Sequence, residues 1–104
     1  MVKMVVLLVR KASLSHEEFA RYWEEEHAPL VEELPNVRRY TTSLPTDPEE
    51  SPYDGIAELY FESTDDIREG FTDDLEADIS ADEEGFLASV DTFVAAEQTQ
   101  LDRR

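Results

Sequence analysis

The stretch Tyr22-Trp23-Glu24-Glu25-Glu26-His27-Ala28-Pro29-Leu30 organises the chain, because a proline interrupts a helical pattern there. It holds the only tryptophan and one of only two histidines. Pro29 lacks a backbone N–H and crowds the carbonyl of Glu25, so we expect the helix to kink or break near His27. A second short helical piece over Leu30–Leu34 should follow. We therefore expect His27 at the centre of any reactive site.

The start of this helix is the most clearly marked boundary in the chain. Ser15 followed by Glu18 is a capping box, and Leu14 and Phe19 occupy the positions of a hydrophobic staple. At roughly 100° per residue, an apolar stripe about 80° wide runs along the helix and includes His27. Its members are Phe19, Trp23, His27, Leu30 and Leu34. The stripe predicts that His27 faces the core.

The remaining elements suggest a sheet for this helix to lie on. Alternating or continuous apolar runs predict four strands, over Val2–Arg10, Val37–Leu44, Gly55–Glu62 and Val90–Thr99. Ser63 with Asp66 should begin a second helix, and Thr72 and Ser80 should cap further short helical segments. The order β-α-β-β-α-β predicts an α+β, ferredoxin-like fold with an antiparallel sheet. We expect one domain over residues 1–104.

The first strand is apolar on both faces, which indicates that both are covered. One face can be covered by the chain's own helices, whereas the other needs a second layer that a short chain cannot supply. This pattern predicts a homodimer in which two sheets face each other and form a barrel-like core.

The charge is strongly negative, with 26 acidic residues against 9 basic ones and a net charge of −17. Such a field repels phosphate backbones and anionic lipids, so we expect neither nucleic acid nor a membrane as a partner. Molar salt shortens the Debye length to about 3 Å and would screen the self-repulsion. We therefore expect a cytoplasmic protein adapted to high salt, as in extreme halophiles. The alternative is an acidic protein of a mesophile. With no cysteine, the chain has neither a disulfide nor a thiol nucleophile.

Several single residues allow more than one interpretation. His27 either acts as a general acid or base, or merely hydrogen-bonds a freed carbonyl and packs on Trp23. His16 should be an exposed surface residue, about 16 Å along the helix axis from His27 and too far away to share a metal. Glu58 lies in mid-strand and either pairs with a neighbouring arginine or lines a polar cavity. The candidate partners of Glu58 are Arg38 and Arg39, and the candidate cavity walls are Tyr40 and Tyr60.

Two motifs together resemble the EthD family: Phe19–Trp23 followed by His27–Leu30, and the strand motif Asp54–Phe61. The resemblance covers nearly the whole chain and implies a dimeric α+β barrel. The family includes a protein needed in bacterial ether degradation and dehydratases or decarboxylases of fungal polyketide pathways. Cofactor-free isomerases, cyclases and monooxygenases occur in the wider superfamily. The resemblance points to His27 and Asp54 as site residues.

Two functions from different classes fit these observations. The first is a cofactor-independent enzyme, of isomerase, dehydratase or oxygenase type, acting on a carbonyl, lactone or aromatic metabolite. His27 would transfer the proton, Asp54 or Glu58 would orient it, and the walls of an apolar pocket would be Trp23, Tyr40 and Tyr60. The second is a non-catalytic small-molecule binding or accessory protein of an oxidative degradation pathway. A dimeric module in which His27 and Glu58 are purely structural is a third interpretation. No metal is expected in any of them.

Overall fold

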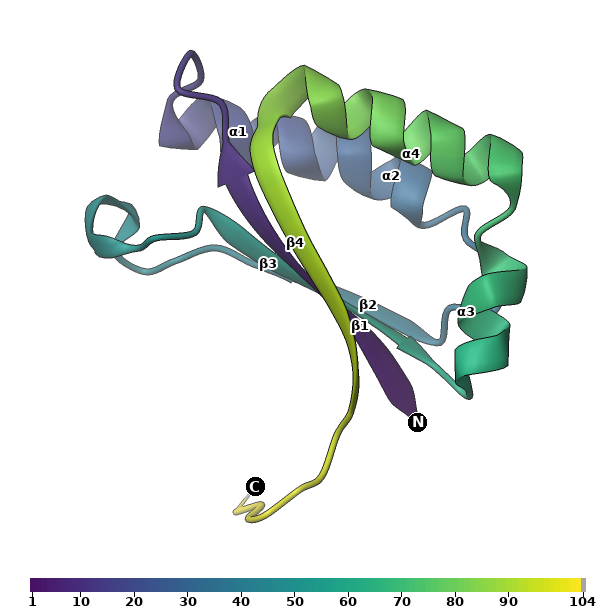
Figure 1. Cartoon of the computed structure of the whole chain (residues 1–104). Coiled ribbons are helices and arrows are strands. Elements are labelled where there is room, and N and C mark those ends of the chain that lie inside the picture. Colours follow the sequence, from purple (N-terminus) through teal and green to yellow (C-terminus); the bar gives the residue numbers. More distant parts are fainter. Residues whose placement is uncertain (104) are drawn as a thin grey trace.

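The chain forms an antiparallel sheet with helices stacked over one face, as Figure 1 shows for the computed structural model, which describes residues 1–103. The strand order is β2-β3-β1-β4. The strands are β1 (Val2–Arg10), β2 (Arg39–Ser43), β3 (Gly55–Phe61) and β4 (Leu87–Ala96). This arrangement confirms the expected α+β, ferredoxin-like fold.

The first helix begins at the predicted cap and continues through the predicted break. In the capping box, Glu18 N–H donates to Ser15 Oγ (3.0 Å) and Ser15 N–H donates to a carboxylate oxygen of Glu18 (2.9 Å). The helical run consists of α1 (His16–Tyr22), a single π-helical turn (Trp23–His27) and α2 (Ala28–Val31).

The π-helical turn replaces the kink that the proline was expected to cause. The Ala28 N–H donates to the Trp23 carbonyl, five residues back, so the helix widens instead of breaking. Pro29 then lies in the first turn of α2, where its fixed φ suits the helix. The expected second piece over Leu30–Leu34 therefore starts earlier and ends at Val31.

The second half of the chain differs more from the expected boundaries. Ser63 and Thr72 cap α3 (Thr64–Gly70) and α4 (Asp73–Phe86), as predicted. The predicted cap at Ser80 is wrong, because Ser80 lies inside the continuous α4. The helix leads directly into β4, which therefore begins at Leu87 and not at Val90. In the loop before β3, a short 3₁₀ helix spans Pro48–Glu50.

The register of β3 decides which residues meet the helices. Gly55, Ala57, Leu59 and Phe61 are buried on the helix side, and the residues between them face the other way. The Trp23 ring covers Gly55 so closely that a Cβ there would lie 2.4 Å from a ring carbon. This contact holds the π-helical turn directly over the sheet. Within residues 1–103, no helix has the length and hydropathy to cross a membrane.

Candidate functional site

A cavity of about 330 Å³ lies between the sheet and the helices, and His27 is in its wall. Most of its lining is apolar, from β1, β3 and the helices. The lining comprises Met4, Val6, Leu8, Trp23, His27, Val31, Leu34, Tyr40, Ala57, Leu59, Phe71, Glu76, Ile79, Ser80, Glu83 and Thr92. An apolar pocket with a few polar groups is the usual form of a small-molecule site.

The imidazole of His27 is buried and held in one orientation. Its residue is only 3% exposed, and its ring packs on Phe86 with the centroids 4.9 Å apart. The Nδ1–H donates to Asp82 Oδ2 over 2.6 Å, a short charge-assisted hydrogen bond. Nε2 lies 4.0 Å from a carboxylate oxygen of Glu83, which also lines the cavity. Nε2 is therefore the ring nitrogen available for chemistry.

Asp82 is fixed by a second donor. The Tyr22 hydroxyl donates to Asp82 Oδ1 over 2.5 Å, so the two carboxylate oxygens hold one donor each. The hydrogen bond to Asp82 raises the pKa of Tyr22 to about 12. The π-helical turn and α4 thus meet through one carboxylate. A carboxylate that orients an imidazole in this way selects its tautomer and stabilises its protonated form.

Two other titratable groups of the cavity are affected by burial. Burial raises the pKa of the Glu83 carboxyl, while the neighbouring His27 acts in the opposite direction and more weakly. Burial also raises the pKa of the Tyr40 phenol to about 12. The tyrosine therefore keeps its proton at neutral pH, where it can still donate a hydrogen bond to a ligand.

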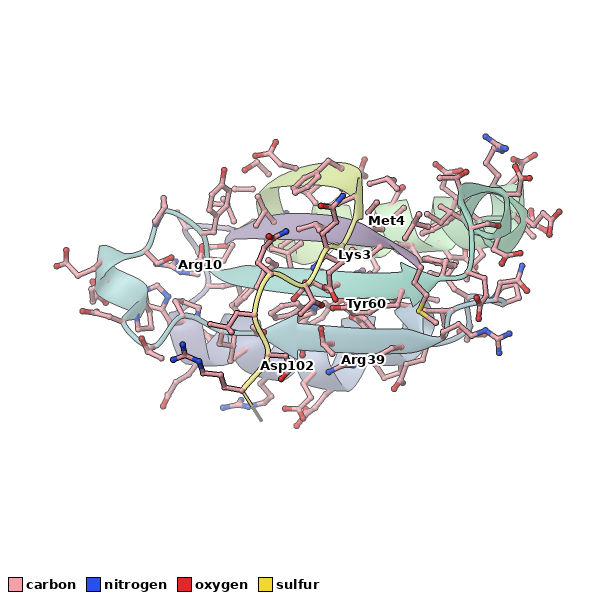
Figure 2. The ribbon with its side chains drawn as sticks, turned by 90° about the horizontal axis from the view of Figure 1, so that it is seen from below. Lys3, Met4, Arg10, Arg39, Tyr60 and Asp102 are labelled. Carbon is pink, nitrogen blue, oxygen red and sulfur yellow. The ribbon has the colours of Figure 1, made fainter. Side chains whose placement is uncertain are left out.

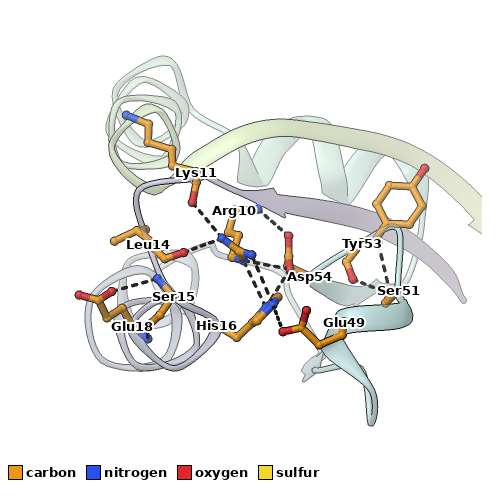
Figure 3. Close-up of polar contacts among 10 residues, drawn as sticks. All are labelled: Arg10, Lys11, Leu14, Ser15, His16, Glu18, Glu49, Ser51, Tyr53 and Asp54. Carbon is orange, nitrogen blue, oxygen red and sulfur yellow. Dashed lines mark hydrogen bonds and ion pairs between the residues drawn. The ribbon is translucent and has the colours of Figure 1, made fainter.

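Of the residues selected from the sequence, the structure brings together Trp23, His27 and Tyr40 in this cavity. Asp54 lies at the other end of α1, where its carboxylate accepts the Arg10 N–H (2.9 Å) and lies 3.3 Å from His16 Nδ1. Figure 3 shows the Arg10 guanidinium at the centre of this cluster, against the His16 ring. His16 is only partly exposed, contrary to expectation. Asp54 ties β1 to the loop before β3 and does not contact His27.

Glu58 and Tyr60 lie on the opposite face of the sheet from the cavity. Glu58 pairs with Lys3 (2.7 Å), whereas Arg38, one of the two expected partners, pairs with Glu62 (3.4 Å). Among the described residues, no ion pair joins Glu58 to Arg39. The Tyr60 ring centroid lies 5.6 Å from Lys3 Nζ and 5.4 Å from Arg39 Cζ, and Figure 2 views the face of the sheet that carries these three residues. The alternation of β3 is the cause, because residues 58 and 60 point away from Ala57 and Leu59. Tyr40 and Tyr60 therefore do not share a cavity.

Three residues of the site, Asp82, Glu83 and Tyr22, were not predicted from the sequence. The signal that would have found Asp82 and Glu83 is their spacing from Ile79 and Phe86, the buried residues of α4. Positions 79, 82, 83 and 86 share a helix face. The prediction of a new helix starting at Ser80 placed residue 79 and residues 82–86 in different helices, so the shared face was not recognised. Within the described residues, no group of three or more His, Cys, Asp or Glu side chains is placed to hold a metal ion.

Comparisons with solved structures support the fold. An EthD family protein of Bacillus halodurans is 20% identical, with a TM-score of 0.79 over 94% of this chain and 99% of that one. A dimeric, ferredoxin-like protein of unknown function from Bacteroides fragilis is 16% identical, with a TM-score of 0.67 over 89% and 92% of the two chains. A hydroxynitrile lyase from Passiflora edulis is 14% identical, with a TM-score of 0.74 over 94% of each chain. At these identities the likeness extends to the fold alone.

The sequence comparisons give one positive finding. A search of curated proteins found no match. The family model of the EthD domain matches residues 11–90, which include the helical run, β2, β3, α4 and the His27–Asp82 pair. The chain therefore belongs to the EthD domain family.

Proposed function

We propose that this protein is a cofactor-independent enzyme that moves a proton on a small, mostly apolar metabolite with a carbonyl, lactone or aromatic group. The observation that carries the proposal is the buried His27–Asp82 pair in the wall of an apolar cavity. An imidazole can act as a general acid or base, and here the side chain is shielded from bulk water, since the residue is only 3% exposed. The hydroxynitrile lyase from Passiflora edulis adds support, because it is an enzyme that acts on a small molecule and has the same fold.

The proposed mechanism uses the two ring nitrogens differently. In the neutral imidazole the proton stays on Nδ1, held by Asp82, so Nε2 carries a free lone pair toward the cavity. Nε2 takes a proton from the substrate, and Asp82 stabilises the resulting imidazolium. The imidazolium then returns the proton to another atom of the substrate. Trp23 and Tyr40 form the walls that position the substrate.

A substrate screen with matched histidine variants tests this role. Wild-type protein is incubated with small carbonyl, lactone and aromatic compounds, and conversion is followed by NMR. For a compound that is converted, His27→Ala should reduce the rate about 10²- to 10⁴-fold, the usual contribution of a general acid or base. His16→Ala is the control, because His16 lies outside the cavity. A folded His27→Ala protein with undiminished turnover would rule out the proposed role of His27.

A binding or accessory protein is the second candidate, and the predominantly apolar lining favours it. Such a protein needs the cavity but no proton transfer, and it would present a hydrophobic metabolite to another enzyme of an oxidative pathway. It predicts compounds that bind equally well to wild type and to a folded His27→Ala variant, without conversion of any of them.

We also propose that the protein acts as a homodimer through the sheet face opposite the helices. Within residues 1–103 no helix covers this face, and Phe93 on it is 53% exposed. Relatives with the same fold are described as dimeric. Light scattering should give twice the chain mass for wild type, and Phe93→Glu should lower it. A monomeric wild type would contradict this part of the proposal.

A further inference from the structure

The cavity has acidic side chains in its lining but no basic side chain other than His27 within the described residues. Along the lining, the ionisable groups are His27, Tyr40 and two glutamates, and within the described residues no lysine or arginine reaches it. The charge of protonated His27 is already balanced by Asp82 at 2.6 Å. Because that pair is neutral overall, it leaves no excess positive charge for a ligand.

The exposed members of the lining mark the side on which the cavity meets solvent. Glu76, Ser80 and Thr92 are exposed, and they belong to α4 and β4. Glu83 lies one turn further along the same face of α4, with its side chain 22% exposed. A ligand that enters between α4 and β4 therefore passes Glu76 and reaches Glu83 beside His27.

We propose that the cavity excludes anions through Glu83 and that its natural ligand is an uncharged apolar molecule, not a carboxylate or a phosphate ester. This inference rests on the proposed function, because it concerns the ligand of the same cavity. A ligand anion beside His27 Nε2 would lie close to the Glu83 carboxylate, which is 4.0 Å from that nitrogen. Like charges at such distances repel strongly where water is scarce. A neutral hydroxyl meets no such repulsion and can donate a hydrogen bond to the Nε2 lone pair or to the Glu83 carboxylate.

The single tryptophan makes the test simple. Trp23 lines the cavity and is only 3% exposed, so its fluorescence reports occupancy without a label. The probes are 4-nitrobenzyl alcohol and 4-nitrobenzoate, which have similar shapes and differ in charge. Titrations are run at pH 8, which is far above the ordinary pKa of a carboxyl group, and in 1 M salt. At that ionic strength the Debye length is about 3 Å, so the net charge of −17 is screened and only local effects remain.

The expected result is a difference that depends on Glu83 alone. Wild type should bind the carboxylate at least tenfold more weakly than the alcohol, and Glu83→Gln should reduce that ratio below threefold. Glu84→Gln is the matched control, because it removes the same charge from the next residue of α4, outside the lining. Equal binding of both probes by wild type, or equal effects of the two variants, would overturn the inference. Binding of neither probe would instead contradict the proposed function, since the cavity would then take no small aromatic ligand.

Discussion

Replacing Asp82 by asparagine should destabilise the protein and also weaken the fixed orientation of the His27 ring. Asp82 accepts charge-assisted hydrogen bonds from Tyr22 (2.5 Å) and His27 (2.6 Å). Such bonds contribute about 1.5–3 kcal/mol each. Asparagine keeps one acceptor oxygen, and its amide can donate to the other group after rearrangement, so only part of the sum is lost. Partial exposure of Asp82 reduces the effect further. We expect the free energy of unfolding to fall by about 2 kcal/mol.

The assay is chemical and thermal denaturation of Asp82→Asn beside Asp78→Asn. Asp78 lies one turn earlier on α4 and is exposed, so its replacement removes the same charge from a very acidic chain without touching the site. A loss of about 2 kcal/mol corresponds to a melting temperature roughly 8–16 °C lower for a domain of this size. The control should stay within about 0.5 kcal/mol of wild type. Equal stability of the two variants would refute the structural importance that we assign to the Asp82 bonds.

A second readout separates orientation from stability. In wild type, ¹⁵N NMR should find the neutral His27 ring with its proton on Nδ1, because a carboxylate can only accept there. In Asp82→Asn the Nε2–H tautomer should become populated, since the asparagine amide can donate to Nδ1. An unchanged tautomer distribution would show that Asp82 does not select it.

Three further predictions concern packing, pH and salt. Gly55→Ala should lower the free energy of unfolding by about 1–3 kcal/mol, because the new Cβ would meet the Trp23 ring. Gly85→Ala, which meets open space in α4, should raise it by about 0.5–1 kcal/mol, and a reversed order in denaturant melts would contradict both packing arguments. Tyr22→Phe should cost about 1.5 kcal/mol at pH 8, the lower end of the range for charge-assisted bonds, because the site is partly exposed. Because the folded-state pKa of Tyr22 is raised to about 12, the wild-type advantage should be complete below about pH 10 and shrink as the pH rises toward that value. A gap that stays constant in denaturant melts from pH 8 to pH 11.5 would show that the bond is not responsible. Dialysis from molar to low salt should cause a large loss of folded circular-dichroism signal, and an unchanged melting temperature would contradict adaptation to salt.

Local features of the chain were predictable from sequence, because they depend on residues a few positions apart. The Ser15 capping box, the caps Ser63 and Thr72, and the bounds of β1 agree with the structure for this reason. The same holds for the place of His27 on a buried stripe and for the alternation of β3. The break at Pro29 was overestimated, since a π-helical turn can absorb a proline without ending the helix.

What only the tertiary structure decided is which faces meet. The alternation of β3 already separates Glu58 and Tyr60 from Ala57 and Leu59, yet it does not reveal which side the His27 helix covers. That choice places Glu58 beside Lys3 and makes Asp82, 55 positions after His27, the hydrogen-bond partner of the histidine. Contacts over such separations depend on the packing of whole elements, here α4 against the π-helical turn through Phe86. Sequence alone therefore identified the histidine, and tertiary packing supplied its partner and its cavity.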